Sequence, residues 1–257
     1  RMNISLLGIF AGLVLLALPI ALLVRLRIPM LENLLVAVAK MAVGMGALGA
    51  LLYWVMEVNN LVLSLAVVLL MIVLATIESI ASSRQPRGRV LIPLLAGVGM
   101  SVVFFSLWFL FLVLGLKNPF VPQQLIPVCG FMSAAVAMTN GKALSAYYAG
   151  LYAHHQLYDY MIGNGATHNE ATSHFQRRAL ERALTPLIKR MAMLMVPLEC
   201  TAAWPLIMMN VSPVQAVLFE VLLLITMMAA SASSLFIAIW LGRHYSFDKY
   251  EQLKKKQ

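Results

Sequence analysis

The chain has few charged residues. Lys, Arg, Asp and Glu make up 11% of its 257 residues and apolar residues 61%, whereas soluble domains hold about 25% and about 45–50%. So little charge excludes an ordinary soluble domain, and the length leaves no room for a soluble catalytic domain beside several membrane helices. We therefore predict an all-α polytopic membrane protein in which residues 1–257 form a single transmembrane domain.

Cysteine and nucleotide-binding motifs are also scarce. Cys129 and Cys200 are the two cysteines, and both lie in apolar runs, which argues against a disulfide framework. Asn140-Gly-Lys-Ala143 lacks the upstream Gly and the following Ser or Thr of a phosphate loop. We expect no enzyme activity and no cofactor on this chain, so that any ATP that drives it is bound by a partner.

Seven apolar runs come close to the about 20 residues that cross a bilayer. The net charge of +9 arises in the connections between these runs, and nearly all basic residues, Arg177 to Arg190 among them, fall on one side. The positive-inside rule then places the N-terminus outside and the C-terminus in the cytoplasm, and it explains the charge without nucleic acid. The runs lie at about 4–24, 35–56, 60–78, 90–115, 124–147, 188–209 and 213–241.

The region of about 148–187 is the longest polar part of the chain. Gly163 and Gly165 predict a helix break, after which Thr167 or Asn169 can cap a new helix. We expect that helix to be short and amphipathic, to end at Pro186 and to dock in a groove of a partner. The residues assigned to this coupling are Gly165, Ala166, Thr167, Glu170, Phe175, Arg177 and Arg178.

Glu199 is a carboxylate well inside the sixth apolar run. Such a residue costs at least about 2.5 kcal/mol unless it faces protein or water. Pro197 and Pro205 flank it and cannot donate backbone hydrogen bonds, which predicts a kink with two free carbonyl groups. Free carbonyls, a carboxylate and the Cys200 sulfur suit a cation. A protonated Glu199 bonded within the bundle is an equally good interpretation.

Two further groups of residues keep other functions open. Cys129, with Met132 near it, could meet Cys200 and Glu199 in a soft-ligand metal path, although packing alone is the commoner role of such residues. An ion-coupled secondary transporter would instead use Glu199 or Glu220 as a proton carrier, but the sequence lacks a clear inverted repeat.

A membrane metalloenzyme would use the histidines of the polar region. His155 and Asp159 are one helical turn apart, but the His-Glu-x-x-His pattern is missing. Solvated loop histidines are therefore the favoured interpretation. The residues concerned are His154, His155, Asp159, His168 and His174.

The segment from Phe120 to Gly130 and the turn at Gly165–Thr167 resemble the membrane subunit of Fet-type ABC transporters. That family includes bacterial permeases linked to iron export and plant relatives linked to aluminium tolerance. Ala134-Ala135 replaces a Gly-Asn pair that is usual in the family, and Pro197–Cys200 replaces Pro-Gly-Met-Met, so the chain resembles a divergent member. The matching residues are Pro122, Gln124, Ile126, Pro127, Gly130, Gly165, Ala166, Thr167, Arg177, Pro186, Pro197 and Pro213.

The resemblance implies a permease of a bacterial cytoplasmic membrane. It would form a homodimer, bind two copies of a separate ATPase and export a metal ion such as iron. The residues that we expect along the substrate pathway are Glu199, Cys200, Cys129 and Met132, and the first three are the expected metal ligands.

Overall fold

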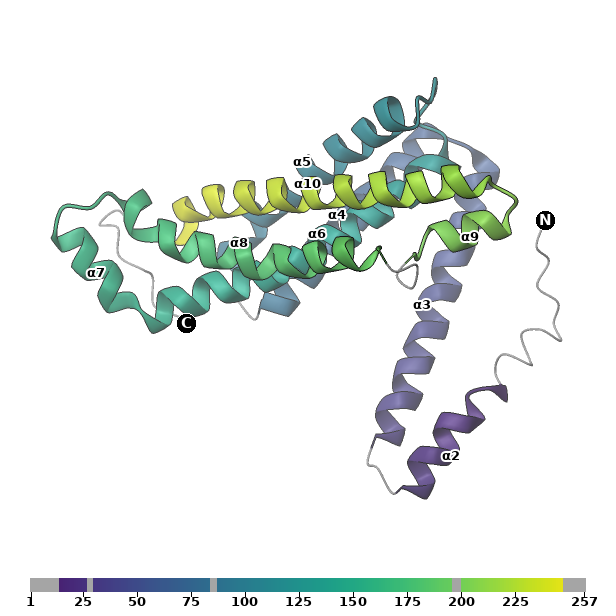
Figure 1. Cartoon of the computed structure of the whole chain (residues 1–257), viewed down its shortest axis with the longest axis horizontal. Helices are drawn as coiled ribbons and strands as arrows, with labels where there is room; N and C mark the ends of the chain where they lie inside the picture. The colour runs from purple at the N-terminus through teal and green to yellow at the C-terminus, as the bar shows by residue number, and fades with distance from the viewer. Residues whose placement is uncertain (1–13, 27–29, 84–86, 196–199, 247–257) are drawn as a thin grey trace. The chain divides into compact units, whose positions relative to one another are not determined.

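The computed structural model describes residues 14–26, 30–83, 87–195 and 200–246, and strands are absent from these ranges. The chain divides into two compact units, Arg1–Val58 and Asn59–Gln257. The first unit contains α2 (Ala17–Arg25) and α3 (Leu31–Val58). The second contains the remaining helices (Figure 1), which are α4 (Leu61–Ser83), α5 (Arg87–Trp108) with its continuation η1 (Phe109–Val113), α6 (Pro122–Ala153), α7 (His155–Gly163), α8 (His168–Met193), α9 (Ala203–Met208) and α10 (Pro213–Ser246).

Four of the described helices are long and apolar enough to cross a membrane: α3, α4, α5 with η1, and α10. The central helix α6 has 32 residues but carries Asn140 and Lys142. It packs against α4, α5, α8 and α10, so much of its surface faces protein and need not be apolar. The chain is an all-α polytopic membrane protein, as its composition predicts. Part of the first predicted run lies outside the described residues.

The second unit buries small polar side chains and exposes large apolar ones, such as Leu69 and Phe236. Ser79 in α4 donates to the carbonyl of Ala75 in its own helix at 2.7 Å and lies 3.3 Å from that of Ala137 in α6. Buried hydroxyl groups between closely packed helices, with apolar residues outside, are typical of a bundle surrounded by lipid.

Two glycines lie where neighbouring helices approach closely. A Cβ on Gly97 of α5 would lie 2.7 Å from the backbone oxygen of Ser234 in α10. A Cβ on Gly141 of α6 would lie 2.6 Å from the Cβ of Ser82 in α4. Helix backbones approach this closely only where one of them lacks a side chain, so these two glycines fix the pairs α5–α10 and α4–α6.

We expect Gly97→Ala to destabilise the second unit, because the added methyl group meets a backbone atom that cannot rotate away. Overpacking of this kind costs about 1–3 kcal/mol. Gly99→Ala is the matched control, since its Cβ would make an ordinary contact at 3.7 Å with Ile72. Thermal unfolding in detergent should show a lower Tm for Gly97→Ala alone. Equal Tm values for the two variants would contradict the close approach of α5 and α10.

Two predictions about the chain after the polar region were wrong. The helix that begins after Thr167 continues through Pro186 to Met193, because the buried residues Ala183 and Leu187 on either side hold it in the bundle. The predicted sixth span at 188–209 is divided between the end of α8 and the short α9. Pro205 is the third residue of α9, where the first turn needs no backbone donor. It therefore permits a helix start rather than kinking a continuous helix.

Candidate functional site

The backbone is not helical at the described residues between α8 and α9. Leu194 and Met195 follow the end of α8, Cys200 to Ala202 precede α9, and 196–199 lie outside the described residues. Non-helical backbone at membrane depth is tolerated only where protein buries it or where it lines a cavity. Discontinuous helices of this kind form the binding sites of many transporters. We call the described residues Leu194, Met195 and Cys200–Ala202 the helix break and treat their surroundings as the candidate site.

Glu220 of α10 lies against the helix break. Its side chain is 2% exposed, and one carboxylate oxygen accepts from the backbone N–H groups of Ala202 at 2.6 Å and Ala203 at 3.0 Å. N–H groups at the start of a helix have no partner within the helix. The carboxylate satisfies two such groups, and their donation offsets part of the cost of burying its charge.

Arg190 extends this contact back to α8. Its guanidinium donates to the hydroxyl of Thr201 at 2.6 Å, and that hydroxyl lies 3.5 Å from the second carboxylate oxygen of Glu220. The chain Arg190–Thr201–Glu220 therefore connects α8, the helix break and α10. The sequence groups Arg190 with the cytoplasmic basic residues, but its hydrogen bond to Thr201 directs it toward the helix break. The sequence does contain a signal for this connection, because Arg190 and Glu220 are a basic and an acidic residue in two consecutive apolar runs.

The predicted metal residues occupy different surroundings. Cys129 and Met132 on α6 are 1% and 0% exposed, and the thiol of Cys129 has Ser106 of α5 as its neighbour, so both belong to the packed core. Cys200 is half-buried at the helix break, and Glu199 lies outside the described residues. Across the described part of the chain, His, Cys, Asp and Glu form no group of three or more that could hold a metal. The site that includes Glu199 stays a prediction.

The histidines of the polar region are solvent-facing where they are described. His154, Asp159 and His174 are exposed, and the side chains of His155 and His168 lie outside the description. The described positions therefore give no support to a metalloenzyme.

The predicted break and cap before α8 are confirmed. Gly165 has a φ of +86°, a conformation that glycine adopts without strain, and it ends α7. Thr167 then caps α8 in a capping box: its hydroxyl accepts from the backbone N–H of Glu170, whose carboxylate accepts from the Thr167 N–H at 2.8 Å. Ala166 lies half-buried between them. The short turn fixes where α7 ends and α8 begins.

Phe175 anchors α8 to α6. The ring is 3% exposed and lies so close to Gly150 that a Cβ there would be 3.2 Å from its Cδ1 atom. Arg177 and Arg178 on the same helix are exposed. The predicted coupling residues therefore divide into one packed aromatic residue, an ordered turn and two basic residues open to a partner.

We expect the capping box to weaken in two ways. Thr167→Ala removes the cap and should cost about 1 kcal/mol of local helix stability. The hydrogen bond from the Thr167 backbone, and then that from its hydroxyl, hold the pKa of the Glu170 carboxyl below its ordinary value. Because the pKa of Glu170 is lower in the folded protein, its carboxylate stabilises the fold at pH values above the pKa of the unfolded chain. This stabilisation is lost as the pH falls through the pKa of the folded protein. Acidification should therefore fray α8.

Hydrogen exchange of the first turn of α8 measures both effects. Thr167→Ala should exchange faster than the parent at neutral pH. Ser173→Ala is the control, because its hydroxyl is exposed and donates to the carbonyl of Glu170 within the same helix. Exchange as slow in Thr167→Ala as in Ser173→Ala would contradict the role of the cap.

The chain matches a known family over most of its length. Residues 5–247 match the family described as "Uncharacterised protein family (UPF0014)". The chain is 24% identical over 231 residues to "UPF0014 membrane protein STAR2" of Oryza sativa subsp. japonica. The matched region covers 88% of this chain and 78% of that protein. No solved structure matches the chain.

A second plant relative is matched over a shorter part. The chain is 26% identical over 172 residues to "Protein ALUMINUM SENSITIVE 3" of Arabidopsis thaliana. The match covers 66% of this chain and 60% of that protein, so more than a third of the relative has no counterpart in the alignment.

Proposed function

The chain belongs to the family described as Uncharacterised protein family (UPF0014), and from this premise we propose that it is the permease subunit of an ABC transporter. Two copies of the chain form a homodimer that binds two copies of a separate ATPase in a bacterial cytoplasmic membrane. The N-terminus lies outside and the C-terminus in the cytoplasm. ATP is bound and hydrolysed on the partner.

The observation that best supports this proposal is the continuity of α8. The helix has 26 residues, which corresponds to about 39 Å. One end carries the ordered turn at Gly165–Thr167 and the other leads into the helix break beside Glu220. Figure 1 shows α7 where α6 leads into α8, and α8 packs against both α6 and α10. A push on the turn at one end would move the site at the other.

The turn and the first half of α8 suit a protein partner. Gly165, Thr167 and Glu170 are exposed at the start of α8, and Arg177 and Arg178 are exposed about two turns further along, while Phe175 holds the helix against α6. A helix held on one face and open on the other is a shape that docks in a groove. We assign this exposed face to the ATPase.

The cargo proposed is a metal ion. Cys200 lies at the helix break, and Glu199 precedes it in the chain. A thiolate and a carboxylate together suit a transition metal. One relative, Protein ALUMINUM SENSITIVE 3, carries a metal in its name. Export is favoured because the turns before α4, α6 and α10 are short and offer no domain on which a separate binding protein could dock.

An ion-coupled secondary transporter is the second candidate, because Glu220 is a buried carboxylate in a candidate membrane span. Its oxygens already accept from Ala202, Ala203 and Thr201. A carboxylate with three donors suits a structural cap better than a carrier that must release its proton in each cycle.

Purification in mild detergent through a C-terminal tag, from the native membrane, tests the proposal. A nucleotide-binding subunit should copurify at two-to-two stoichiometry, and the complex should hydrolyse ATP. A homo-oligomer without a partner and without ATPase activity would overturn the proposal and favour the ion-coupled alternative.

A further inference from the structure

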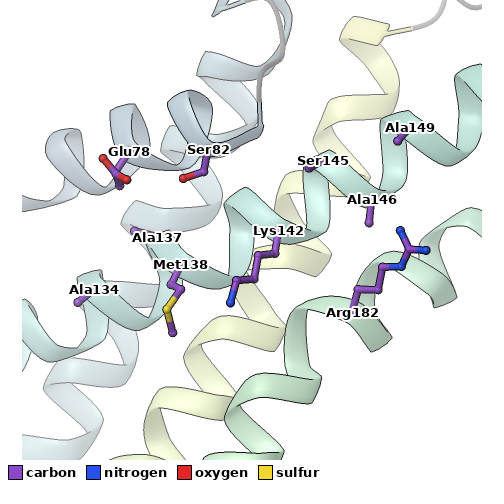
Figure 2. A pocket seen from close by; sticks show the side chains of 10 residues that line it. All are labelled: Glu78, Ser82, Ala134, Ala137, Met138, Lys142, Ser145, Ala146, Ala149 and Arg182. Carbon is purple, nitrogen blue, oxygen red and sulfur yellow. The ribbon is translucent and has the colours of Figure 1, made fainter. Parts of the chain in front are cut away.

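A charged groove lies on the second unit, away from the helix break. It is bordered by α4, α6 and α8 and has a volume of about 790 Å³. Figure 2 shows Lys142 of α6 between Glu78 of α4 and Arg182 of α8. Two cations and one carboxylate give these charged residues a net charge of +1, and all three are exposed. Uncompensated charge on a membrane bundle requires a polar or charged neighbour.

The groove changes character along α6. Ala134, Ala137 and Met138 line one end, and Lys142, Ser145 and Ala149 continue toward the other. The distance from the first to the last of these residues is about 22 Å at the rise of an α-helix. The α6 side of one end is therefore apolar, with Glu78 of α4 opposite it, and the other end offers an ammonium group, a hydroxyl group and the guanidinium of Arg182.

The position of Lys142 relative to α4 shows where the groove lies relative to the membrane surface. The preceding residue, Gly141, touches Ser82, and α4 ends at Ser83. Because α4 is a candidate membrane span, its end marks the edge of the apolar layer. The basic part of the groove thus begins at the membrane surface, and the apolar part lies within the layer of acyl chains.

We propose that this groove binds an anionic phospholipid. Lys142 and Arg182 bind the phosphate group, Ser145 donates to it, and an acyl chain lies along Ala134, Ala137 and Met138. Basic pockets between membrane helices at the membrane surface bind such headgroups, and charge-assisted hydrogen bonds to phosphate are strong. The proposal does not depend on the partner ATPase.

A second copy of the chain fits the groove less well. A symmetric interface places the same surface on both subunits, so a pair of these grooves would bring together four cations and two carboxylates, which leaves a net charge of +2. The lipid instead supplies the missing negative charge on its headgroup and an apolar chain for the opposite end.

Native mass spectrometry of the full-length protein in detergent tests the proposal with phosphatidylglycerol and phosphatidylcholine. We expect the parent to retain phosphatidylglycerol preferentially. Lys142→Gln with Arg182→Gln should weaken this binding about 25-fold, at about fivefold for each cation lost at a membrane surface. Lys117→Gln with Lys189→Gln removes the same charge from exposed positions outside the groove and should bind like the parent. Equal loss in both double variants would overturn the proposal.

Two further measurements identify what occupies the groove. Ala134→Trp fills its apolar end from an exposed position and should abolish lipid retention without lowering the Tm. Inorganic phosphate should fail to displace the bound lipid at millimolar concentration. Displacement by phosphate alone, with lipid retention unchanged in Ala134→Trp, would show a free-anion site and overturn the lipid. A protein dimer that these variants dissociate, with no lipid bound to the parent, would assign the groove to a second copy.

Discussion

Glu220→Ala should be the most destabilising single substitution around the helix break. It removes the acceptor of two backbone N–H groups and leaves Arg190 without the carboxylate beyond Thr201. Each buried N–H group that loses its acceptor costs about 1–3 kcal/mol, and two such groups lose theirs. Glu220→Gln keeps an acceptor oxygen and should cost less, about 1–3 kcal/mol for a charged hydrogen bond made neutral. The Tm in detergent should therefore rank the parent above Glu220→Gln and Glu220→Ala lowest.

A double-mutant cycle with Arg190→Ala separates the chain of hydrogen bonds from packing. If Arg190 acts through Thr201 on Glu220, the two substitutions should be less damaging together than the sum of their separate effects, with a coupling of about 0.5–3 kcal/mol. Glu57→Ala is the control, because Glu57 is exposed near the end of α3 and surface changes stay within about 0.5 kcal/mol. A Glu220→Ala protein as stable as Glu57→Ala would refute the capping role.

The parts of the fold that the sequence predicts well are those that local chemistry decides. Gly165 and Thr167 combine a residue that favours positive φ with an N-cap side chain, and both act as expected. The residues that set this structure are within a few positions of one another.

The parts that the sequence did not reveal depend on contacts between distant residues. Pro186 normally argues for a helix end, yet tertiary packing carries α8 through it to Met193. The division of the sixth run depends on Glu220, which lies 17 and 18 positions from the N–H groups that it accepts from. Hydropathy reports apolar length only, so it could not show that a carboxylate of α10 replaces the helical bonds of Ala202 and Ala203.

Interrupting α8 between its two ends should uncouple transport from ATP hydrolysis, if the proposed function is correct. Arg177→Gly with Arg178→Gly introduces two glycines at exposed positions of the helix, each costing about 1 kcal/mol in helix stability. Local unwinding can then absorb a push applied at Gly165–Thr167 before it reaches the helix break. We expect ATP-driven export by reconstituted vesicles to fall about tenfold or more, while ATP hydrolysis by the complex persists.

Arg177→Ala with Arg178→Ala is the control that isolates stiffness from charge. It removes the same two basic groups but keeps a residue with the highest helix propensity, so α8 stays rigid. If both variants lose export equally, together with the copurified ATPase, the basic pair acts in docking and the continuity of α8 is not tested by transport alone. Hydrogen exchange across α8 then shows whether the glycines have loosened the helix. If exchange is faster in the glycine variant but its export equals that of the alanine variant, α8 does not transmit the motion. Loss of export in the glycine variant alone, with the ATPase still bound, would place the coupling in the rigidity of the helix that joins the ordered turn to Arg190 and Glu220.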